Sequence, residues 1–240
     1  MAKKFLRVIF ILVLGLIGGI FADQVFCPYF IERPLFYKYR LEQASVYVTE
    51  KNEIVVQENT ALQDAVDKVK RVIVGVRAET RKGKVIEGSG LIITSDGLTV
   101  TLASIIPQGE TFTLFLDNNP VPFQVLKRDS KKDLALVLIA PEGKSLPTIA
   151  FGDMDKTRLG ERVFLVGNIF GENGIEKTVN TGIIKNLYSD FIQTNILEEN
   201  IIKGSALFNI KGEALGLNTL NSAGEVVAIP IDQVKEFAGF

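Results

Sequence analysis

The chain has 240 residues, of which 47% are hydrophobic and 23% charged, and its net charge is −1. This composition is typical of a folded protein, and the absence of a basic cluster beyond the N-terminus argues against nucleic-acid binding. The chain contains no histidine and one cysteine, Cys27. We therefore expect no internal disulfide, no cofactor and no metal site, and catalysis by a histidine base is excluded.

Residues 1–22, MAKKFLRVIFILVLGLIGGIFA, place three basic residues ahead of an uncharged apolar run. Apolar stretches behind positive charge are typical of membrane anchors and signal peptides, and they direct the rest of the chain across the membrane. No small-residue cleavage site follows. We expect residues 5–22 to stay in the membrane as a signal-anchor helix, with the folded domain extracytoplasmic, in the periplasm or at the cell surface. Secretion after cleavage of a signal peptide is the alternative.

Residues 23–58 are predicted to form an exported spacer. Two alternating segments within it, SVYVTE and EIVVQE, favour an edge hairpin. A helix is predicted over about residues 60–70, where Thr60 and Gln63 fit a capping box. Its apolar residues fall on one helical face: Leu62, Ala65, Val66 and Val69.

From Val72 onward the pattern changes to short β-rich runs separated by turn signals. The first set is VIVGVRAE, GSGLIITS, LTVTLASI, FTLFLD, FQVLKRD and LALVLIA; the second is ERVFLVGN, EKTVNTGIIKNL, FIQTNIL, SALFNI, EALGLNTL and VVAIPI. Two sets of about six predict an all-β fold with two six-stranded antiparallel β-barrels. The first barrel would span about 72–140 and the second about 149–232, within a domain of residues 59–240. A short helix is expected from Ile231.

Six segments in this order resemble the trypsin-like protease domain of the HtrA/Deg family of serine proteases, over about Val72 to Asp232. The segments are EGSGLIITSDGLTVTLASI, RDSKKDLALVLI, IAFGDMDKTRLGERVFLVGNIFG, FIQTNI, GEALGLNT and VAIPID. The resemblance implies a chymotrypsin-like double barrel, with the N-terminal membrane helix and short helices flanking it. It also implies peptides or unfolded protein segments as ligands.

The same resemblance carries the family's catalytic positions onto this chain. The catalytic aspartate is retained as Asp133, whereas Ser104 stands at the histidine position and Lys203 at the position of the nucleophilic serine. Backbone N–H groups of Lys203 and of Ile201 occupy the oxyanion-hole positions, and a β-branched residue resists the conformations that glycine accepts there. Ser205 comes two residues late and is expected to point elsewhere. In a serine-protease triad the carboxylate only orients and stabilises the base. Since both the base and the nucleophile are replaced at these positions, the triad is predicted to be degenerate.

Two arrangements are open for Asp133. The Lys203 ammonium either points toward Asp133 or Ser104, or it stays solvated while backbone N–H groups hold the carboxylate. Candidate residues for a peptide-binding cleft, also implied by the resemblance, are Ile196, Leu197, Glu198, Ile202, Asn218 and Thr219.

The function predicted from these residues is that of a membrane-anchored pseudoprotease, inactive as an enzyme, that keeps a peptide-binding, scaffold or regulatory role. One alternative is an active serine endopeptidase in which Ser104 and Lys203 exchange the roles of nucleophile and base. The other is an inactive assembly subunit that forms homo- or hetero-oligomers with HtrA-type proteases.

Overall fold

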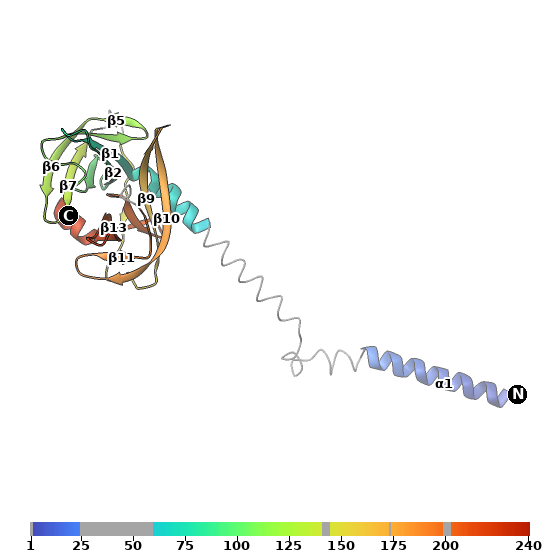
Figure 1. Cartoon of the computed structure of the whole chain (residues 1–240). Helices are drawn as coiled ribbons and strands as arrows, with labels where there is room; N and C mark the ends of the chain where they lie inside the picture. The colour runs from blue at the N-terminus through green and yellow to red at the C-terminus, as the bar shows by residue number, and fades with distance from the viewer. Residues whose placement is uncertain (1, 25–59, 141–144, 173, 199–202) are drawn as a thin grey trace. The chain divides into compact units, whose positions relative to one another are not determined.

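A computed structural model describes residues 2–24, 60–140, 145–172, 174–198 and 203–240 (Figure 1). The chain divides into two units, Met1–Gln57 and Glu58–Phe240. The described part of the first unit contains the predicted N-terminal helix, α1 (Ala2–Phe21). Its segment Leu6–Gln24 is long and apolar enough to cross a membrane, a property that a signal sequence near an N-terminus shares. The hairpin predicted within the spacer lies outside the described residues.

The second unit begins with the predicted amphipathic helix. Residues 60–69 are helical and continue into a 3-10 turn, η3 (Lys70–Val72), that leads directly to the first strand. The predicted apolar face is confirmed, since all four of its residues are buried or pack against the main core: Leu62, Ala65, Val66 and Val69.

The first sheet follows the six predicted runs and adds one strand. Its strands are β1 (Ile73–Glu79), β2 (Val85–Ile92), β3 (Leu98–Thr101), β4 (Thr111–Leu116), β5 (Asn119–Val121), β6 (Phe123–Asp129) and β7 (Leu134–Ile139), in the order β5-β4-β1-β2-β3-β7-β6. The sequence did not predict β5, because DNNP reads as a turn. The turn is shorter: Asp117 and Asn118 both have positive φ, 47° and 66°, so β5 returns at once along β4.

The second sheet closes into a barrel. Its strands are β8 (Ala150–Phe151), β9 (Arg162–Gly171), β10 (Gly174–Leu187), β11 (Ile192–Thr194), β12 (Ala206–Asn209), β13 (Glu213–Leu220) and β14 (Val226–Pro230). Strand β12 pairs with both β9 and β13, which closes the six predicted strands, and the short β8 joins β13 in parallel. The first sheet is a half-barrel, and stacking of Phe112 on Phe123 at 4.6 Å links its β4 and β6. The fold is thus a chymotrypsin-like double barrel.

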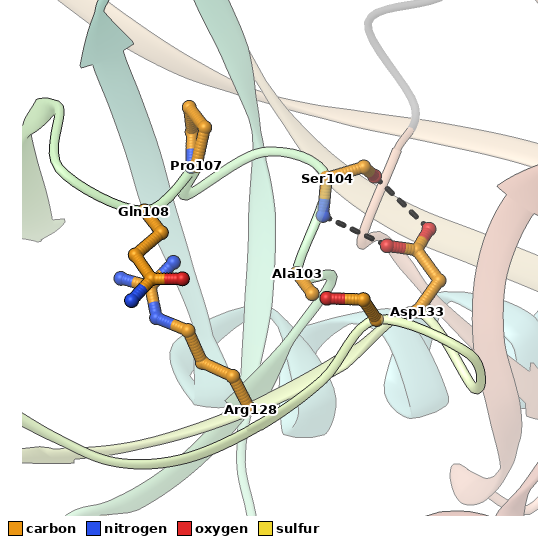
Figure 2. A pocket seen from close by; sticks show the side chains of 7 residues that line it. Ala103, Ser104, Pro107, Gln108, Arg128 and Asp133 are labelled. Atoms are coloured by element: carbon orange, nitrogen blue, oxygen red, sulfur yellow. Dashed lines mark hydrogen bonds between the residues drawn. The ribbon is translucent and has the colours of Figure 1, made fainter.

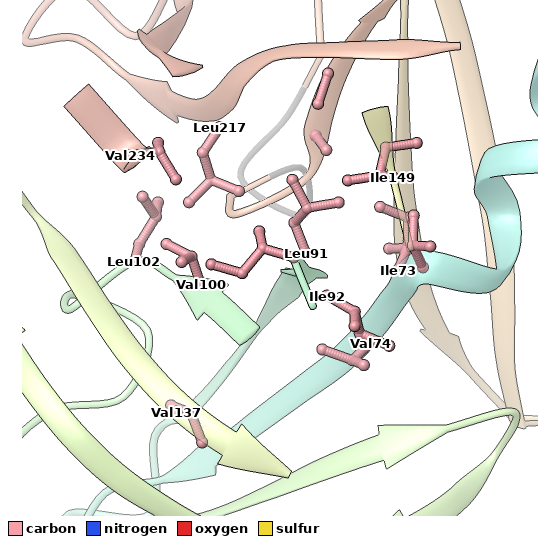
Figure 3. Close-up of a cluster of buried hydrophobic side chains, with 14 of the residues drawn as sticks. Ile73, Val74, Leu91, Ile92, Val100, Leu102, Val137, Ile149, Leu217 and Val234 are labelled. Atoms are coloured by element: carbon pink, nitrogen blue, oxygen red, sulfur yellow. The ribbon is translucent and has the colours of Figure 1, made fainter. Parts of the chain in front are cut away.

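A shared hydrophobic core joins the two halves. Figure 3 shows Leu91 and Val100 of the first sheet near Leu217 of β13 and Val234 of the C-terminal helix, and all four belong to one buried cluster. Strand β9 is buried on both faces, which explains its unbroken apolar run. Its residues alternate between the shared core, which receives Phe164 and Val166, and the interior of the closed barrel, which receives Val163 and Leu165.

The last helix, α4 (Ile231–Ala238), starts at the residue predicted for it. It attaches the end of the chain to the first half-barrel, where Lys127 of β6 donates a hydrogen bond to the Phe237 carbonyl at 3.0 Å and lies over the Phe237 ring. Gly239 ends the helix in the left-handed conformation, at φ 94°.

Candidate functional site

Asp133 and Ser104 meet at one end of the first half-barrel. Strands β3 and β7 are paired neighbours, with Thr101 opposite Ala135, so the segment after β3 lies beside the turn before β7. The Ser104 backbone N–H donates to Asp133 Oδ1 at 2.8 Å, and the Ser104 hydroxyl donates to Asp133 Oδ2 at 2.9 Å. Figure 2 shows the two side chains facing each other across these bonds. Both oxygens of the carboxylate therefore have a partner.

The backbone of Asp133 contributes to the same contact. Its φ is 51°, in the left-handed region that aspartate tolerates better than most residues do. Its carbonyl accepts a hydrogen bond from the Ala103 N–H at 3.2 Å. Three hydrogen bonds thus join the two loops, and the uncommon backbone conformation is held in place by them.

A cavity of about 560 Å³ opens beside this pair. Its walls consist of Ala103, Ser104, Pro107, Gln108, Arg128, Ser130 and Asp133. Arg128 lies over the ring of Phe112, and burial lowers the pKa of its guanidinium. No salt bridge of the described residues involves Arg128, so its positive charge faces the cavity without an acidic partner.

Lys203 lies at the junction of the two halves. Its carbonyl accepts a hydrogen bond from the Ser89 N–H of β2 at 2.9 Å, and the next residue, Gly204, donates to the Asn218 carbonyl of β13 at 2.8 Å. Gly204 has a φ of +76°, and a Cβ on it would come within 2.1 Å of the Ser89 carbonyl and 3.0 Å of Ile105 Cδ1. Position 203 is thus fixed close to the loop that carries Ser104.

The Lys203 ammonium does not take part in the Asp133 contact. No ion pair between Lys203 and Asp133 occurs within 4.0 Å among the described residues, and Ser104 supplies both donors to the carboxylate. The carboxylate is thus held by a backbone N–H, as in the second of the two arrangements left open by the sequence, with the serine hydroxyl as an additional donor. Lys203 itself is half-buried, and the solvated ammonium of that arrangement stays a prediction. Ile201, the other predicted oxyanion-hole position, lies outside the described residues.

Ser205 points away from the cavity, as predicted. It is fully buried, and its hydroxyl oxygen accepts a hydrogen bond from Asn218 Nδ2 at 3.0 Å. Asn218, one of the predicted cleft residues, is therefore an interior residue, and its Oδ1 atom has no partner among the described residues.

The other predicted cleft residues are spread over several environments. Ile196 is buried, Leu197 is 85% exposed, and Glu198 accepts a hydrogen bond from Asn180 at 2.7 Å. Thr219 pairs with Val227 in the β13–β14 ladder, and Ile202 lies outside the described residues. None of the described ones lines the cavity beside Ser104, and their part in peptide binding stays a prediction.

A second polar cluster, which the sequence did not reveal, lies where β9 and β10 pass the first half-barrel. Lys177 and Asn168 are cross-strand partners. The Lys177 ammonium donates to Asn168 Oδ1 at 2.9 Å and to the Ile73 carbonyl of β1 at 2.5 Å. Lys177 is exposed as a residue, but its charged end is turned inward, and burial of that end lowers its pKa to about 8. Arg128 was missed as well, since lone basic residues in alternating strands normally face solvent.

Comparisons with known proteins agree with the fold and the order of segments. The profile of the trypsin-like peptidase domain family matches residues 88–217, just over half of the chain. A "Probable periplasmic serine endoprotease DegP-like" of Brucella suis biovar 1 (strain 1330) is 31% identical over 186 residues, 67% of this chain and 36% of the relative. The same-named protein of Rhizobium meliloti (strain 1021) is 32% identical over 177 residues, 68% of this chain and 34% of the relative.

A "Serine protease HTRA1" of Xenopus laevis is 33% identical over 164 residues, 62% of this chain and 35% of the relative. The chain spans about a third of the length of these curated relatives. The matched region contains strands β3 and β7, which position Ser104 and Asp133, and it extends into β13. The chain belongs to the HtrA-type branch of the trypsin-like peptidase family.

Proposed function

We propose that this protein is an extracytoplasmic, membrane-anchored pseudoprotease that binds extended protein segments without cleaving them. The observation that carries the proposal is the closed contact between Asp133 and Ser104 in a chain without histidine. In a serine protease the carboxylate orients an imidazole, and the imidazole takes the proton from the nucleophile. Here the carboxylate bonds directly to the residue at the imidazole position.

This arrangement supports inactivity for a chemical reason. A serine hydroxyl at neutral pH needs a base within hydrogen-bond reach to become nucleophilic, and a carboxylate is a much weaker base than imidazole. Among the described residues, the Ser104 hydroxyl has only the Asp133 carboxylate in that role. An exchanged Ser104–Lys203 pair would need the lysine amine at the serine hydroxyl. That hydroxyl is instead committed to Asp133, so we propose no catalytic role for Lys203.

Binding without cleavage needs a cleft and chemistry that recognises peptide. The cavity beside Ser104 supplies space, hydroxyl and amide groups, and the Arg128 guanidinium. Proteins of many kinds hold an extended peptide through backbone pairing and use pockets for alternate side chains. Since Arg128 is the unpaired charge at this cavity and Asp133 is satisfied by Ser104, we expect segments with an acidic side chain to bind preferentially.

The proposed location rests on two observations. Helix α1 contains a segment, Leu6–Gln24, that can cross a membrane, and basic residues precede it. Two of the relatives named above are called periplasmic. We propose that the helix is retained as an anchor and holds the β-domain outside the cytoplasm.

The test is a binding measurement on the full chain in detergent micelles with fluorescein-labelled, unfolded casein. We expect saturable binding by fluorescence anisotropy, weakened about threefold or more by Arg128→Gln because a charge-assisted contact is removed. Arg158→Gln, at an exposed arginine of the second half, is the matched control and should bind as the natural chain does. Absence of binding by the natural chain would refute the proposal. Equal binding by the Arg128→Gln variant would show that the cavity beside Ser104 is not where the segment binds.

A further inference from the structure

A cavity of about 280 Å³ lies beside the Lys177–Asn168 cluster and shares no residue with the cavity at Ser104. The residues around it are Phe115, Asp117, Asn118, Asn168, Ile175 and Lys177. They come from strand β4 and the β4–β5 turn on one side and from strands β9 and β10 on the other. The cavity therefore lies between the two halves of the domain, away from the family's catalytic positions.

Asn168 contains a buried donor that the protein leaves without a partner. The residue is 2% exposed, and its Nδ2 has no hydrogen-bond partner among the described residues. The orientation of the amide is determined by its neighbour, because the Lys177 ammonium only donates and must face Oδ1. The NH₂ group consequently points elsewhere. A buried amide left unsatisfied is destabilising, so such a group in a folded protein calls for a bound acceptor.

Lys177 has spare donor capacity at the same place. Its ammonium carries three N–H groups, and two of them bond to the Ile73 carbonyl and Asn168 Oδ1. Both acceptors are neutral, so no anion compensates the cost of burying the charge, and the pKa of Lys177 falls to about 8. Asp117 acts in the opposite direction and raises this pKa, but it forms no salt bridge with Lys177 within 4.0 Å.

The remaining walls add a negative charge and an apolar surface. Asp117 is exposed in a tight turn whose positive φ angles fix its backbone. Phe115 and Ile175 are half-buried, and Phe115 also meets Phe170 of β9 edge to face at 5.8 Å. One cavity thus combines two unused donors, one carboxylate and two apolar side chains.

We propose that this cavity binds a single aliphatic α-amino acid in its zwitterionic form. The carboxylate of the ligand accepts hydrogen bonds from Lys177 Nζ and Asn168 Nδ2, and its ammonium pairs with Asp117. Its side chain packs on Phe115 and Ile175. The volume is below the range of about 300–1,000 Å³ that drug-sized ligands occupy, which favours one amino acid over a peptide.

A ligand bound in this cavity would link the two halves of the domain. The ligand would contact the β4–β5 turn of the first half and the β9–β10 hairpin of the second, in addition to the existing bond from Lys177 to Ile73. Because it binds the folded chain only, it would raise the thermal midpoint of unfolding in a concentration-dependent way.

The experiment compares three ligands that share the isobutyl side chain of leucine on the full chain in detergent, by isothermal titration calorimetry and thermal unfolding. L-Leucine has both charged groups, 4-methylpentanoate lacks the ammonium, and isoamylamine lacks the carboxylate. We expect leucine to bind about tenfold more tightly than 4-methylpentanoate, and isoamylamine to show no saturable binding up to about 20 mM. Equal binding of all three ligands would show that the cavity recognises only their apolar part, and this would overturn the proposal. Absence of leucine binding at about 20 mM would overturn it as well.

Two substitutions then test the roles of the charges. Lys177→Met should weaken leucine binding about tenfold or more, and Asp117→Asn should make leucine and 4-methylpentanoate bind alike. Exposed residues provide the matched controls, Lys185→Met on the same strand and Asp155→Asn, which should leave binding unchanged. Loss of binding in a control, or unchanged binding in both cavity variants, would contradict the assignment. The three-ligand comparison on the natural chain stands even if a variant does not fold.

Discussion

The two polar clusters of this domain differ in how completely they satisfy themselves. At Asp133 every carboxylate oxygen has a donor from Ser104, the residue that the family resemblance places at the histidine position. At Asn168 and Lys177 the internal bonds use only part of the available donors, and the buried NH₂ group of Asn168 has no partner among the described residues. On the account proposed above, the first cluster lacks a reaction because Asp133 and Ser104 satisfy each other without a base, whereas the donors left over at Asn168 and Lys177 mark the proposed ligand site.

The largest loss of stability is expected for a substitution at Gly204, at the junction of the two halves on which both polar clusters depend. Gly204→Ala should destabilise the fold by about 3 kcal/mol, because a Cβ would meet the Ser89 carbonyl at 2.1 Å and force a left-handed conformation. Ser89 also accepts a hydrogen bond from the Asn168 backbone through its hydroxyl, so the strain would reach both clusters. Chemical denaturation measures the loss.

Gly224→Ala is the matched control for this substitution. Gly224 has a φ of +79°, but no atom lies within 4 Å of the position a Cβ would take. It should therefore show the conformational cost alone, about 1 kcal/mol. Equal losses for the two variants would show that the contact of Gly204 with Ser89 is not what requires glycine there.

A smaller loss of stability is expected when the contact between Asp133 and Ser104 is broken. Asp133→Ala removes the acceptor of two hydrogen bonds and should cost about 1–3 kcal/mol in the free energy of unfolding, whereas Ser104→Ala should cost about 1 kcal/mol. A double-mutant cycle should give a coupling energy of at least about 0.5 kcal/mol between the two residues. Additive losses would mean that the hydroxyl–carboxylate bond contributes nothing and that the cluster is not closed in solution.

The cluster of Lys177 and Asn168 should make the stability of the protein depend on pH. The pKa of Lys177 is about 8 in the folded chain, below the ordinary lysine value of 10.5, so between these values the unfolded chain binds the additional proton. Stability therefore rises with pH across this window, and the cost of the buried charge is fully present below about pH 8. We expect a gain of about 1 kcal/mol, reduced from the full linkage value because the side chain is partly exposed.

Lys177→Met should remove this rise, because the residue then has no proton to release. Lys185→Met, at an exposed lysine of the same strand, should retain it. Unfolding curves of the three chains between about pH 7 and pH 10 make the comparison. A rise that persists in the Lys177 variant would assign the pH dependence to another group.

The sequence predicted the architecture well, because alternation and turn chemistry are local signals. The helix over residues 60–69, twelve of the strands and the start of α4 follow from apolar periodicity. The two strands it missed, β5 and β8, are short, and each depends on a partner strand rather than on its own composition. The open form of the first half depends on the same kind of long-range pairing.

The site was predictable only where a motif marked it. Ser104 and Asp133 were placed together through segments that resemble a known family, and the structure brings them into contact. Lys177 and Asn168 lie nine residues apart on separate strands, and their pairing depends on the register of the β9–β10 hairpin. A missing partner for a buried amide is a property of three-dimensional packing, so nothing in the sequence could indicate it.

The most direct test of the central claim is hydrolysis by the unaltered chain. Purified full-length protein in detergent is incubated with unfolded casein, and new peptide termini are counted by mass spectrometry beside a Ser104→Ala preparation. The account predicts that casein stays bound and intact, with no termini beyond those in the Ser104→Ala sample. Cleavage by the natural chain that disappears in Ser104→Ala, with fluorophosphonate labelling of Ser104, would contradict it.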